Sequence, residues 1–250
     1  MDLSDYIAAV EDGYSEVGLG SGVGFPRENL WIQGNESQQL NGGHLCEGSK
    51  ASFKFKAALL PNLGGTGVQA YTAGLPMGLE TYMFLFDTTT GSLTAIMEVL
   101  YYDWLKTAVV SAVATRYLAP PDSSVLALFG TGRHARSQLY ALTSILPIKQ
   151  VFAYSRTPET RDAFCKKMSD ELSIPVVSVN SPDEALQDAD IITTITTSPT
   201  PVFDGQALPN KPLHINAMGA HYPWVREVDE HVVVNSRVFV DEWKQGLQEN

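Results

Sequence analysis

Cysteine and positive charge are both scarce in this sequence. The two cysteines, Cys46 and Cys165, lie far apart and form no CxxC pair, so neither a disulfide framework nor a zinc site is expected. No other metal site is predicted. The formal net charge of −11 argues against a nucleic-acid partner and against binding to an anionic membrane surface.

Long apolar runs are missing as well. No run approaches the ~20 residues that a helix needs to span a bilayer. The first residues, MDLSDYIAAV, lack the basic and apolar regions of a signal peptide. We therefore expect a cytoplasmic protein. Its 250 residues are enough for one large or two modest domains.

Strands and helices alternate in the second half of the chain. The apolar run SVLALFG indicates a strand that is buried on both faces of a parallel sheet. Further strands are expected at QVFAYS, PVVSV, DIITTIT, LHINAMG and VFVD. Helices are expected over residues 135–145, 158–172 and 182–187. This alternation predicts an α/β, Rossmann-type, doubly wound parallel sheet over residues 120–250.

The first 119 residues predict a smaller α+β domain that ends at the Pro120-Pro121 pair. Strands are expected between Leu30 and about Thr90, where aromatic and β-branched residues alternate with breaks at Gly and Pro. The segment GLGSGVGFPREN is expected to be a loop that exposes Arg27. Tyr71 and Trp104 are interpreted as core or dimer-interface residues, and the alternative is that they line a substrate pocket. Helices are expected over residues 3–14 and 102–118.

The strongest motif is a G-x-G-x-x-A spacing formed by Gly130, Gly132 and Ala135. The first glycine permits a tight turn, the second lets the backbone approach a pyrophosphate, and the small third residue lets helix pack on strand. The helix start offers free N–H groups, and Arg133, His134 and Arg136 add donors. Because the motif follows a strand and opens a helix, it predicts a nicotinamide dinucleotide site. The alternative is a glycine-rich turn without a ligand.

The choice between the two nicotinamide cofactors depends on the end of the second strand. Ser155, Arg156 and Thr157 stand where NAD enzymes usually place an acidic residue for the ribose. A guanidinium and two hydroxyls suit a 2′-phosphate, so NADP (NADPH) is favoured and NAD is possible. In the alternative, Thr157 only caps the next helix and Arg156 is solvated.

Six segments carry a wider resemblance: FDTTTGSLTAIME, KTAVVSAVATRYLA, GTGRHARSQL, YSRTPE, DADIITTITTSPTPVF and HINAMGAHYPWVREVD. In this order and spacing the chain resembles the ornithine cyclodeaminase/mu-crystallin family. The resemblance implies a substrate-binding and dimerisation domain over residues 1–119 and a dinucleotide-binding Rossmann domain over residues 120–250. It also implies a homodimer that acts on a small amino- or imino-acid substrate. Relatives continue past Asn250, so we expect a fold that is shortened at the C-terminus.

The same resemblance implies roles for individual residues. Arg27 matches the arginine that clamps the substrate carboxylate, and the alternative is a solvated loop arginine. Two segments, the second of them at the end of a strand, are expected to flank the nicotinamide ring from opposite sides. They are Thr196, Thr197 and Ser198 on one side, and Asn216, Ala217, Met218 and Gly219 on the other. For Asn216 the alternative is a turn residue that bonds its own backbone.

Three positions depart from the family pattern. Gln69 replaces a lysine and supplies neither charge nor a proton. Lys106 replaces an arginine and keeps the charge but loses the bidentate fork. His221 replaces the acid–base aspartate of cyclodeaminases, and we leave open whether it is a proton donor or a bystander.

The altered residue set favours reduction over cyclodeamination. Cyclodeamination needs several proton transfers, whereas reduction of an imine needs one proton donor and a hydride. We therefore predict an NAD(P)H-dependent oxidoreductase of the ketimine reductase or amino-acid dehydrogenase type, which reduces the C=N bond of a small imino acid or cyclic imine. The alternatives are an ornithine cyclodeaminase-like ammonia-lyase with bound NAD, and a catalytically weak dinucleotide-binding protein.

Overall fold

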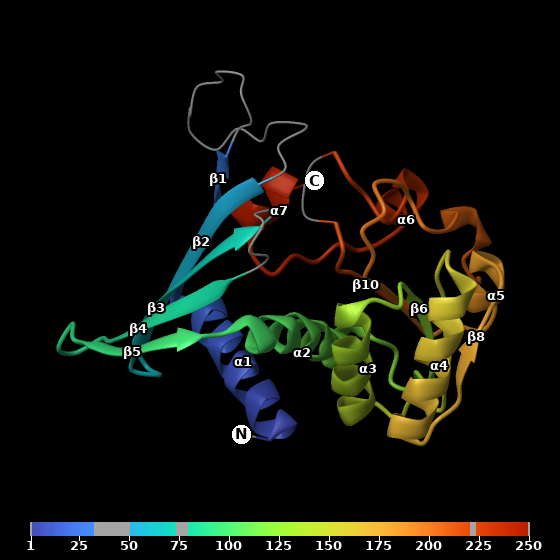
Figure 1. The fold of residues 1–250 in the computed structure, drawn as a ribbon, viewed down its shortest axis with the longest axis horizontal. Coiled ribbons are helices and arrows are strands. Elements are labelled where there is room, and N and C mark those ends of the chain that lie inside the picture. The colour runs from blue at the N-terminus through green and yellow to red at the C-terminus, as the bar shows by residue number, and fades with distance from the viewer. Residues whose placement is uncertain (1, 33–50, 74–79, 221–223, 250) are drawn as a thin grey trace. The chain divides into compact units, whose positions relative to one another are not determined.

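The computed structural model describes residues 2–32, 51–73, 80–220 and 224–249 (Figure 1). The chain divides into two compact units, each with its own five-stranded sheet. The first unit comprises residues 1–8, 104–239 and 249, and the second comprises residues 9–103, 240–248 and 250. No helix in the described part of the chain is both long and apolar enough to cross a membrane.

The first unit contains a parallel sheet with the strand order β10-β9-β6-β7-β8. Its strands are β6 (Val125–Phe129), β7 (Gln150–Tyr154), β8 (Val176–Ser178), β9 (Ile191–Thr194) and β10 (His214–Ala217). The chain winds outward from β6 to β8 and then returns to β9 on the other side of β6. This reversal creates a topological switch point between β6 and β9, where ligands bind in such sheets. The predicted α/β fold is confirmed.

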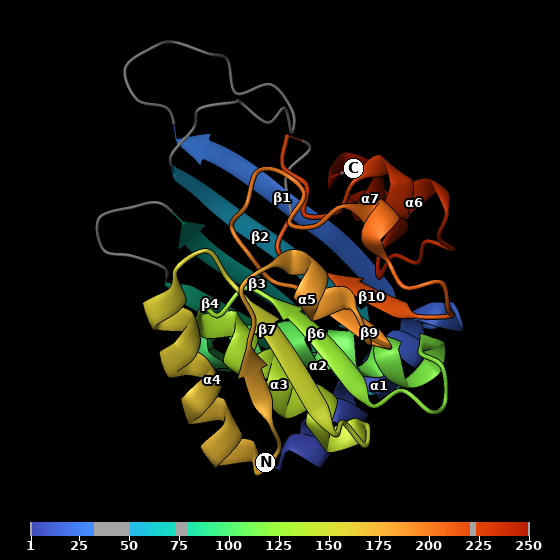
Figure 2. The same ribbon diagram turned by 90° about the vertical axis from the view of Figure 1, so that its right-hand side faces the viewer.

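Helices cover both faces of this sheet (Figure 2). Leu126 and Leu128 pack in one apolar cluster with α3 (Arg133–Ile145) and α4 (Pro158–Leu172). Ala127 and Phe129 pack in a second cluster with α5 (Pro182–Leu186) and α6 (Glu230–Val234). Because alternate residues of β6 face opposite clusters, the strand has no polar face, as its continuous apolar run predicts.

The second unit contains an antiparallel sheet whose strands follow one another in sequence order. They are β1 (Val23–Ile32), β2 (Ala51–Leu60), β3 (Gly65–Ala73), β4 (Thr81–Asp87) and β5 (Leu93–Glu98). The helix α7 (Trp243–Glu249) is assigned largely to the same unit. The long helices α1 (Leu3–Gly18) and α2 (Leu100–Leu118) each contribute residues to both units.

The two faces of the antiparallel sheet differ in chemistry. The register places Phe53 opposite Leu30, and both side chains are exposed. On the other face Lys56 lies directly opposite Gln69. Because successive residues of a strand point to opposite faces, one face of β2 is aromatic and aliphatic and the other carries lysine.

Two expectations about local structure are wrong. Residues 23–32 form β1 rather than a loop, so Arg27 is a half-buried strand residue. The glycines and the proline lower the strand propensity there, but pairing with β2 outweighs it. The expected strand VFVD is not formed. Val238, Phe239 and Val240 are exposed, and in the described part of the chain no strand pairs with them.

Candidate functional site

Gly130 makes the turn that leaves β6. Its φ is +103°, and a Cβ atom built on it would lie 2.5 Å from the carbonyl oxygen of Ile195. Its N–H donates to the carbonyl of Tyr154 at 2.9 Å, while the N–H of Ile195 donates to the carbonyl of Phe129 at 2.9 Å. The backbones beyond β6 and β9 therefore meet at the switch point with no room for a side chain.

Gly132 stands at the N-cap of α3 with no side-chain cap hydrogen bond. A Cβ atom added there would meet nothing within 4 Å. The first N–H groups of the helix therefore start beside open space, which is where the motif places a pyrophosphate. Ala135 is fully buried in the cluster with Leu126 and Leu139, as the small third residue of the motif requires.

Trp104 supports the residue that follows Gly132. The guanidinium carbon of Arg133 lies 4.6 Å from the centroid of the Trp104 ring, a cation–π contact. The ring of His134 meets the same tryptophan edge-on at 6.3 Å. Arg133 is thus held over an aromatic ring at the start of α3. Arg136 is engaged elsewhere, because its guanidinium pairs with Glu171 of α4 at 3.1 Å.

The segment after β7 presents the side chains predicted to select the cofactor. The Ser155 hydroxyl lies 3.0 Å from that of Thr131, which joins this segment to the glycine-rich turn. Arg156 and Thr157 are exposed. Thr157 occupies the N-cap of α4, yet its hydroxyl makes no cap hydrogen bond. Its side chain therefore does not serve as the cap that the alternative interpretation requires.

A buried arginine that the sequence does not single out lies under this segment. Arg161 is 4% exposed. Its guanidinium donates to the Ser178 hydroxyl at 2.6 Å, to Asn180 Oδ1 at 3.0 Å and to the Ser155 carbonyl at 3.5 Å. Hydrogen bonds from Ser178 and Arg161 hold the pKa of the Asp162 carboxyl below its usual range. Arg161 thus links α4 and the end of β8 to the cofactor-selecting segment.

Glu227 is a second residue that the sequence does not single out. Its carboxylate is 1% exposed and accepts the backbone N–H groups of Thr196 at 2.5 Å and Gly219 at 2.6 Å. It also accepts the Thr194 hydroxyl at 2.8 Å. The two loops predicted to flank the nicotinamide ring are therefore tied together. Thr197 is exposed, and the Ser198 N–H donates to the Thr196 hydroxyl at 3.0 Å.

Asn216 is buried within β10. Its amide donates to the Thr115 hydroxyl of α2 at 2.9 Å, and its oxygen lies 3.0 Å from His214 Nε2. The alternative of a turn residue bonded to its own backbone is therefore wrong. Burial lowers the pKa of His214 against the opposing hydrogen bond to Asn216. The Met218 N–H donates to the Thr194 carbonyl at 2.9 Å, which extends the β9–β10 pairing toward Gly219.

The residues expected around the substrate are divided between the units. Lys106 is half-buried in α2 and belongs to the first unit. Arg27 and Gln69 belong to the second, where Gln69 is buried in β3. His221 lies outside the described residues.

Arg27 lies at an irregularity of β1. The register with β2 shifts between Phe25 and Glu28, which marks a β-bulge, and the Arg27 N–H donates to Gln245 Oε1 of α7 at 2.6 Å. Bulges re-aim side chains and are frequent beside functional sites. Arg27 is therefore held by the sheet and by α7, and the alternative of a solvated loop arginine is wrong.

Lys54 is a buried cation that the sequence does not single out. It is 3% exposed, and burial together with the positive charge of Arg27 lowers its pKa to about 8. The ammonium nitrogens of Lys54 and Lys56 each lie 5.9 Å from the centroid of the Tyr71 ring. The alternation in SFKFKAAL indicates a two-faced strand, but it does not show which face is covered.

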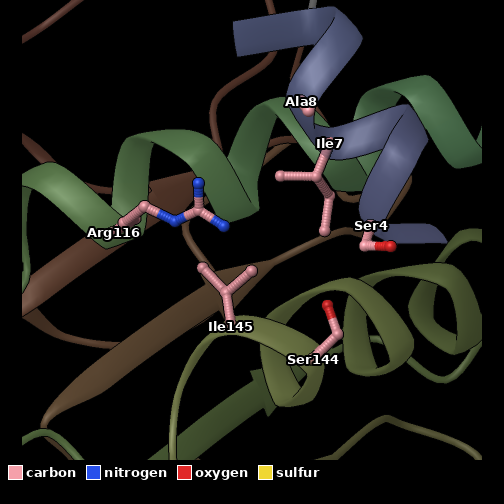
Figure 3. A pocket seen from close by; sticks show the side chains of 6 residues that line it. All are labelled: Ser4, Ile7, Ala8, Arg116, Ser144 and Ile145. Carbon is pink, nitrogen blue, oxygen red and sulfur yellow. The ribbon is translucent and has the colours of Figure 1, made fainter.

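A separate hollow of about 200 Å³ lies among α1, α2 and α3 in the first unit (Figure 3). Its lining residues are Ser4, Ile7, Ala8, Arg116, Ser144 and Ile145. Its lining residues on α3, Ser144 and Ile145, are at the C-terminal end of that helix, whereas the glycine-rich turn leads into the N-terminal end. It therefore does not form part of the dinucleotide site. Among the described residues no group of three or more His, Cys, Asp or Glu side chains is placed to hold a metal ion.

Comparison with known proteins adds family relationships to this geometry. The model of the ornithine cyclodeaminase/mu-crystallin family matches residues 65–249. Delta(1)-pyrroline-2-carboxylate reductase of Bacillus cereus is 33% identical over 167 residues, which cover 67% of this chain and 51% of the relative. Ketimine reductase mu-crystallin of Rattus norvegicus is 34% identical over 172 residues, which cover 68% and 53%.

A solved structure has a similar fold. The iminosuccinate reductase of Paracoccus denitrificans, determined in complex with NAD+, superimposes with a TM-score of 0.87 at 25% identity. The match covers 100% of this chain and 74% of that one. The present chain spans about half the length of the curated relatives it matches.

Proposed function

Because the chain belongs to the ornithine cyclodeaminase/mu-crystallin family, we propose that it functions in the nicotinamide-dependent reduction of a small imino acid or cyclic imine. The observation that carries this proposal is the switch point of the parallel sheet. There, Gly130 leaves no room for a Cβ atom, Gly132 opens the start of α3, and Glu227 ties together the two loops beyond β9 and β10. These features fit a dinucleotide, since the phosphates need close backbone approach and free N–H groups.

Residues of this chain would bind the substrate and supply the proton, while the cofactor supplies the hydride. The nicotinamide, when bound, supplies the hydride to the imine carbon. Arg27 would hold the substrate carboxylate through its planar fork, and Lys106 would add a second positive charge. His221, or a water, would deliver the proton to the imine nitrogen. Residues 1–119 would then bind substrate and residues 120–250 would bind cofactor.

We favour NADPH over NADH for this site. Arg156 and Thr157 are exposed at the end of β7, and the Ser155 backbone is supported by Arg161, whose guanidinium adds positive charge nearby. A 2′-phosphate suits this set, whereas an unmodified ribose would be expected to meet an acidic residue. Use of NADH is the alternative, in keeping with the NAD+ in the related iminosuccinate reductase.

The exposed apolar face of the antiparallel sheet supports a homodimer. Its exposed side chains are Val23, Phe25, Leu30, Phe53, Leu59, Tyr82 and Ile96. A contiguous apolar patch of this kind marks an interface in a soluble protein. Light scattering should report a dimer that Ile96→Asp dissociates and that Val234→Asp, at an exposed valine of α6, leaves intact. A monomeric parent chain would contradict this assignment.

The central experiment is calorimetric titration of the full chain with NADPH and NADH, followed by turnover assays with cyclic imines and with imino acids formed from 2-oxo acids and ammonia. We expect NADPH to bind and to be oxidised in the presence of an imine. Arg156→Ala should weaken NADPH binding about tenfold or more and leave NADH binding unchanged, because only the 2′-phosphate is lost as a partner. Lys166→Met, at an exposed lysine of α4, is the matched control.

Three outcomes would overturn the proposal in different ways. Cofactor binding without turnover of any imine or amino acid would indicate a dinucleotide-binding protein. Ammonia release from ornithine without net cofactor consumption would indicate a cyclodeaminase. If neither cofactor binds, the assignment of a dinucleotide site would be wrong.

A further inference from the structure

Two arginines near the start of α3 are held in different ways. The guanidinium of Arg136 pairs with the Glu171 carboxylate at 3.1 Å, which neutralises its charge. The guanidinium carbon of Arg133 lies 4.6 Å from the centroid of the Trp104 ring, and in the described part of the chain no carboxylate pairs with it. An aromatic ring attracts a cation without neutralising it, so Arg133 retains a charge that an anion can meet.

The position of Arg133 is unfavourable for the helix alone. It is the first residue of α3, directly after the N-cap Gly132, and the first turn of the helix carries no acidic side chain. The N-terminus of a helix bears a partial positive charge, so a cation there is repelled and an anion is attracted. An anion bound at this end would therefore interact favourably with both the helix and Arg133.

Trp104 lies on a packed face of α2. Ala108, Ser111 and Thr115 follow it at steps of four, three and four residues, so they share its face of the helix. All three of these side chains are buried. The Thr115 hydroxyl also accepts the amide of Asn216 at 2.9 Å, which ties the same face to β10. The tryptophan ring is therefore carried by an element that is fixed to the parallel sheet, and not by a loop.

We propose that Trp104 is a positioning residue for the dinucleotide, because its ring holds Arg133 where the guanidinium binds the pyrophosphate. The inference rests on the proposed function in taking the ligand to be a nicotinamide dinucleotide. A Cβ atom at the neighbouring Gly132 would meet nothing within 4 Å, so a phosphate has space to approach the helix start. The planar N–H donors of a guanidinium match the oxygens of a phosphate. Because both cofactors contain the pyrophosphate, this contact should contribute equally to NADPH and NADH binding, unlike that of Arg156.

The competing explanation is that Arg133 only covers the apolar ring of Trp104 and contributes to folding, as arginine stems often do. The two explanations differ in how the residues act together. If Trp104 acts through Arg133, removal of the ring weakens cofactor binding only while the arginine is present. If the contact is structural, removal of either side chain lowers the free energy of unfolding and leaves the cofactor affinity of the folded chain unchanged.

The experiment is a double-mutant cycle on cofactor affinity, measured by calorimetric titration of the full chain with NADPH and with NADH. Arg133→Met should weaken the binding of both cofactors about tenfold, because it removes a charge-assisted contact to phosphate. Trp104→Leu should weaken both about threefold, and Trp104→Phe, which retains an aromatic ring, should recover most of that loss. In the Arg133→Met background, Trp104→Leu should have no further effect on affinity.

Lys149→Met is the matched control for the loss of one positive charge. Lys149 is exposed and directly precedes β7, so it lies at the amino end of that strand, whereas cofactors bind at the carboxyl ends in such sheets. This variant should leave both affinities unchanged. Added salt supplies a second readout that a structural role would not reproduce. It should reduce the effect of Arg133→Met, because Arg133 is exposed and its charge is screened.

The outcomes for the two proposals are distinguishable. If the cycle behaves as expected but no imine is reduced, the inference stands and the proposed function fails. If imines are reduced and Arg133→Met leaves both affinities unchanged, the proposed function stands and the inference is wrong. The inference is also wrong if Trp104→Leu weakens binding equally with and without Arg133, or if Arg133→Met weakens the binding of NADPH alone. Binding of neither cofactor by the parent chain would overturn both proposals.

Discussion

The Glu227 carboxylate accepts the backbone N–H of Gly219 at 2.6 Å, and through its other oxygen it accepts the N–H of Thr196 at 2.5 Å. One buried side chain thus holds the loops that follow β9 and β10. No Cβ atom fits at Gly219, because it would collide with this carboxylate and with the Thr196 carbonyl. The conformation of the two loops therefore depends on the Glu227 carboxylate as acceptor and on the absence of a side chain at Gly219.

Glu227→Gln is expected to loosen both loops. The amide of glutamine presents an NH2 group to one of the two N–H donors, so one buried donor is left without an acceptor at a cost of about 1–3 kcal/mol. Thermal unfolding should shift downward, and calorimetry should show weaker cofactor binding. Glu230→Gln, at an exposed position of α6, is the control and should change neither. Unaltered cofactor affinity in Glu227→Gln would separate these loops from the cofactor site.

The two glycines of the motif should respond differently to alanine. Gly130→Ala forces a Cβ atom to within 2.5 Å of the Ile195 carbonyl at a φ of +103°, so we expect a loss of about 3 kcal/mol or more in the free energy of unfolding. Gly132→Ala meets nothing within 4 Å and should leave the unfolding transition nearly unchanged. It should still weaken cofactor binding, because the new methyl group occupies space beside the helix start. Unfolding curves and cofactor titrations test both variants, and normal NADPH affinity in Gly132→Ala would contradict the placement of the pyrophosphate.

The parallel sheet could be predicted because its signals are local. The run SVLALFG is apolar at every position, and only a strand covered on both faces needs that pattern. The glycine spacing adds a backbone requirement that Gly130 meets through its positive φ. Each of these features depends only on a few residues that are adjacent in sequence.

Other features depend on partners that are distant in sequence. The strand β1 forms despite its glycines and proline because β2 pairs with it. The two strands are separated in sequence, so the local residue pattern of β1 does not reveal this pairing. VFVD has strand composition but no paired neighbour in the described part of the chain. Burial of Lys54 and Arg161 likewise follows from the packing of whole elements, although Arg161 does share helical spacing with the buried Cys165 and Met168.

Arg161→Met should change cofactor discrimination more than it changes folding. The methionine fills the buried space, but it cannot hold the Ser155 carbonyl, Ser178 and Asn180 in one arrangement. We expect NADPH to bind about tenfold more weakly, with a smaller effect on NADH, because the segment that follows Ser155 would contact the 2′-phosphate. Calorimetric titrations with both cofactors measure the ratio of the NADPH affinity to the NADH affinity. Equal losses of affinity for NADPH and NADH would show that Arg161 supports only the fold. Lys167→Met, on the exposed side of α4, controls for the loss of positive charge.

Lys54→Met is expected to stabilise the fold. The pKa of Lys54 is about 8 in the folded chain against an ordinary value of 10.5. Between these values the unfolded chain binds more protons, so this residue makes the free energy of unfolding rise with pH across that window. Below it, at pH 7, the charged form is present in both states and its burial opposes folding.

Removal of that charge should therefore raise the free energy of unfolding at pH 7 by about 0.5–2 kcal/mol, in the range of other stabilising single substitutions. The difference between Lys54→Met and the parent chain should shrink as the pH rises from 8 toward 10.5, because the parent sheds the same charge. Chemical denaturation at several pH values measures this difference directly, with Lys166→Met as the control. A Lys54→Met variant that is less stable than the parent at pH 7 would contradict this expectation.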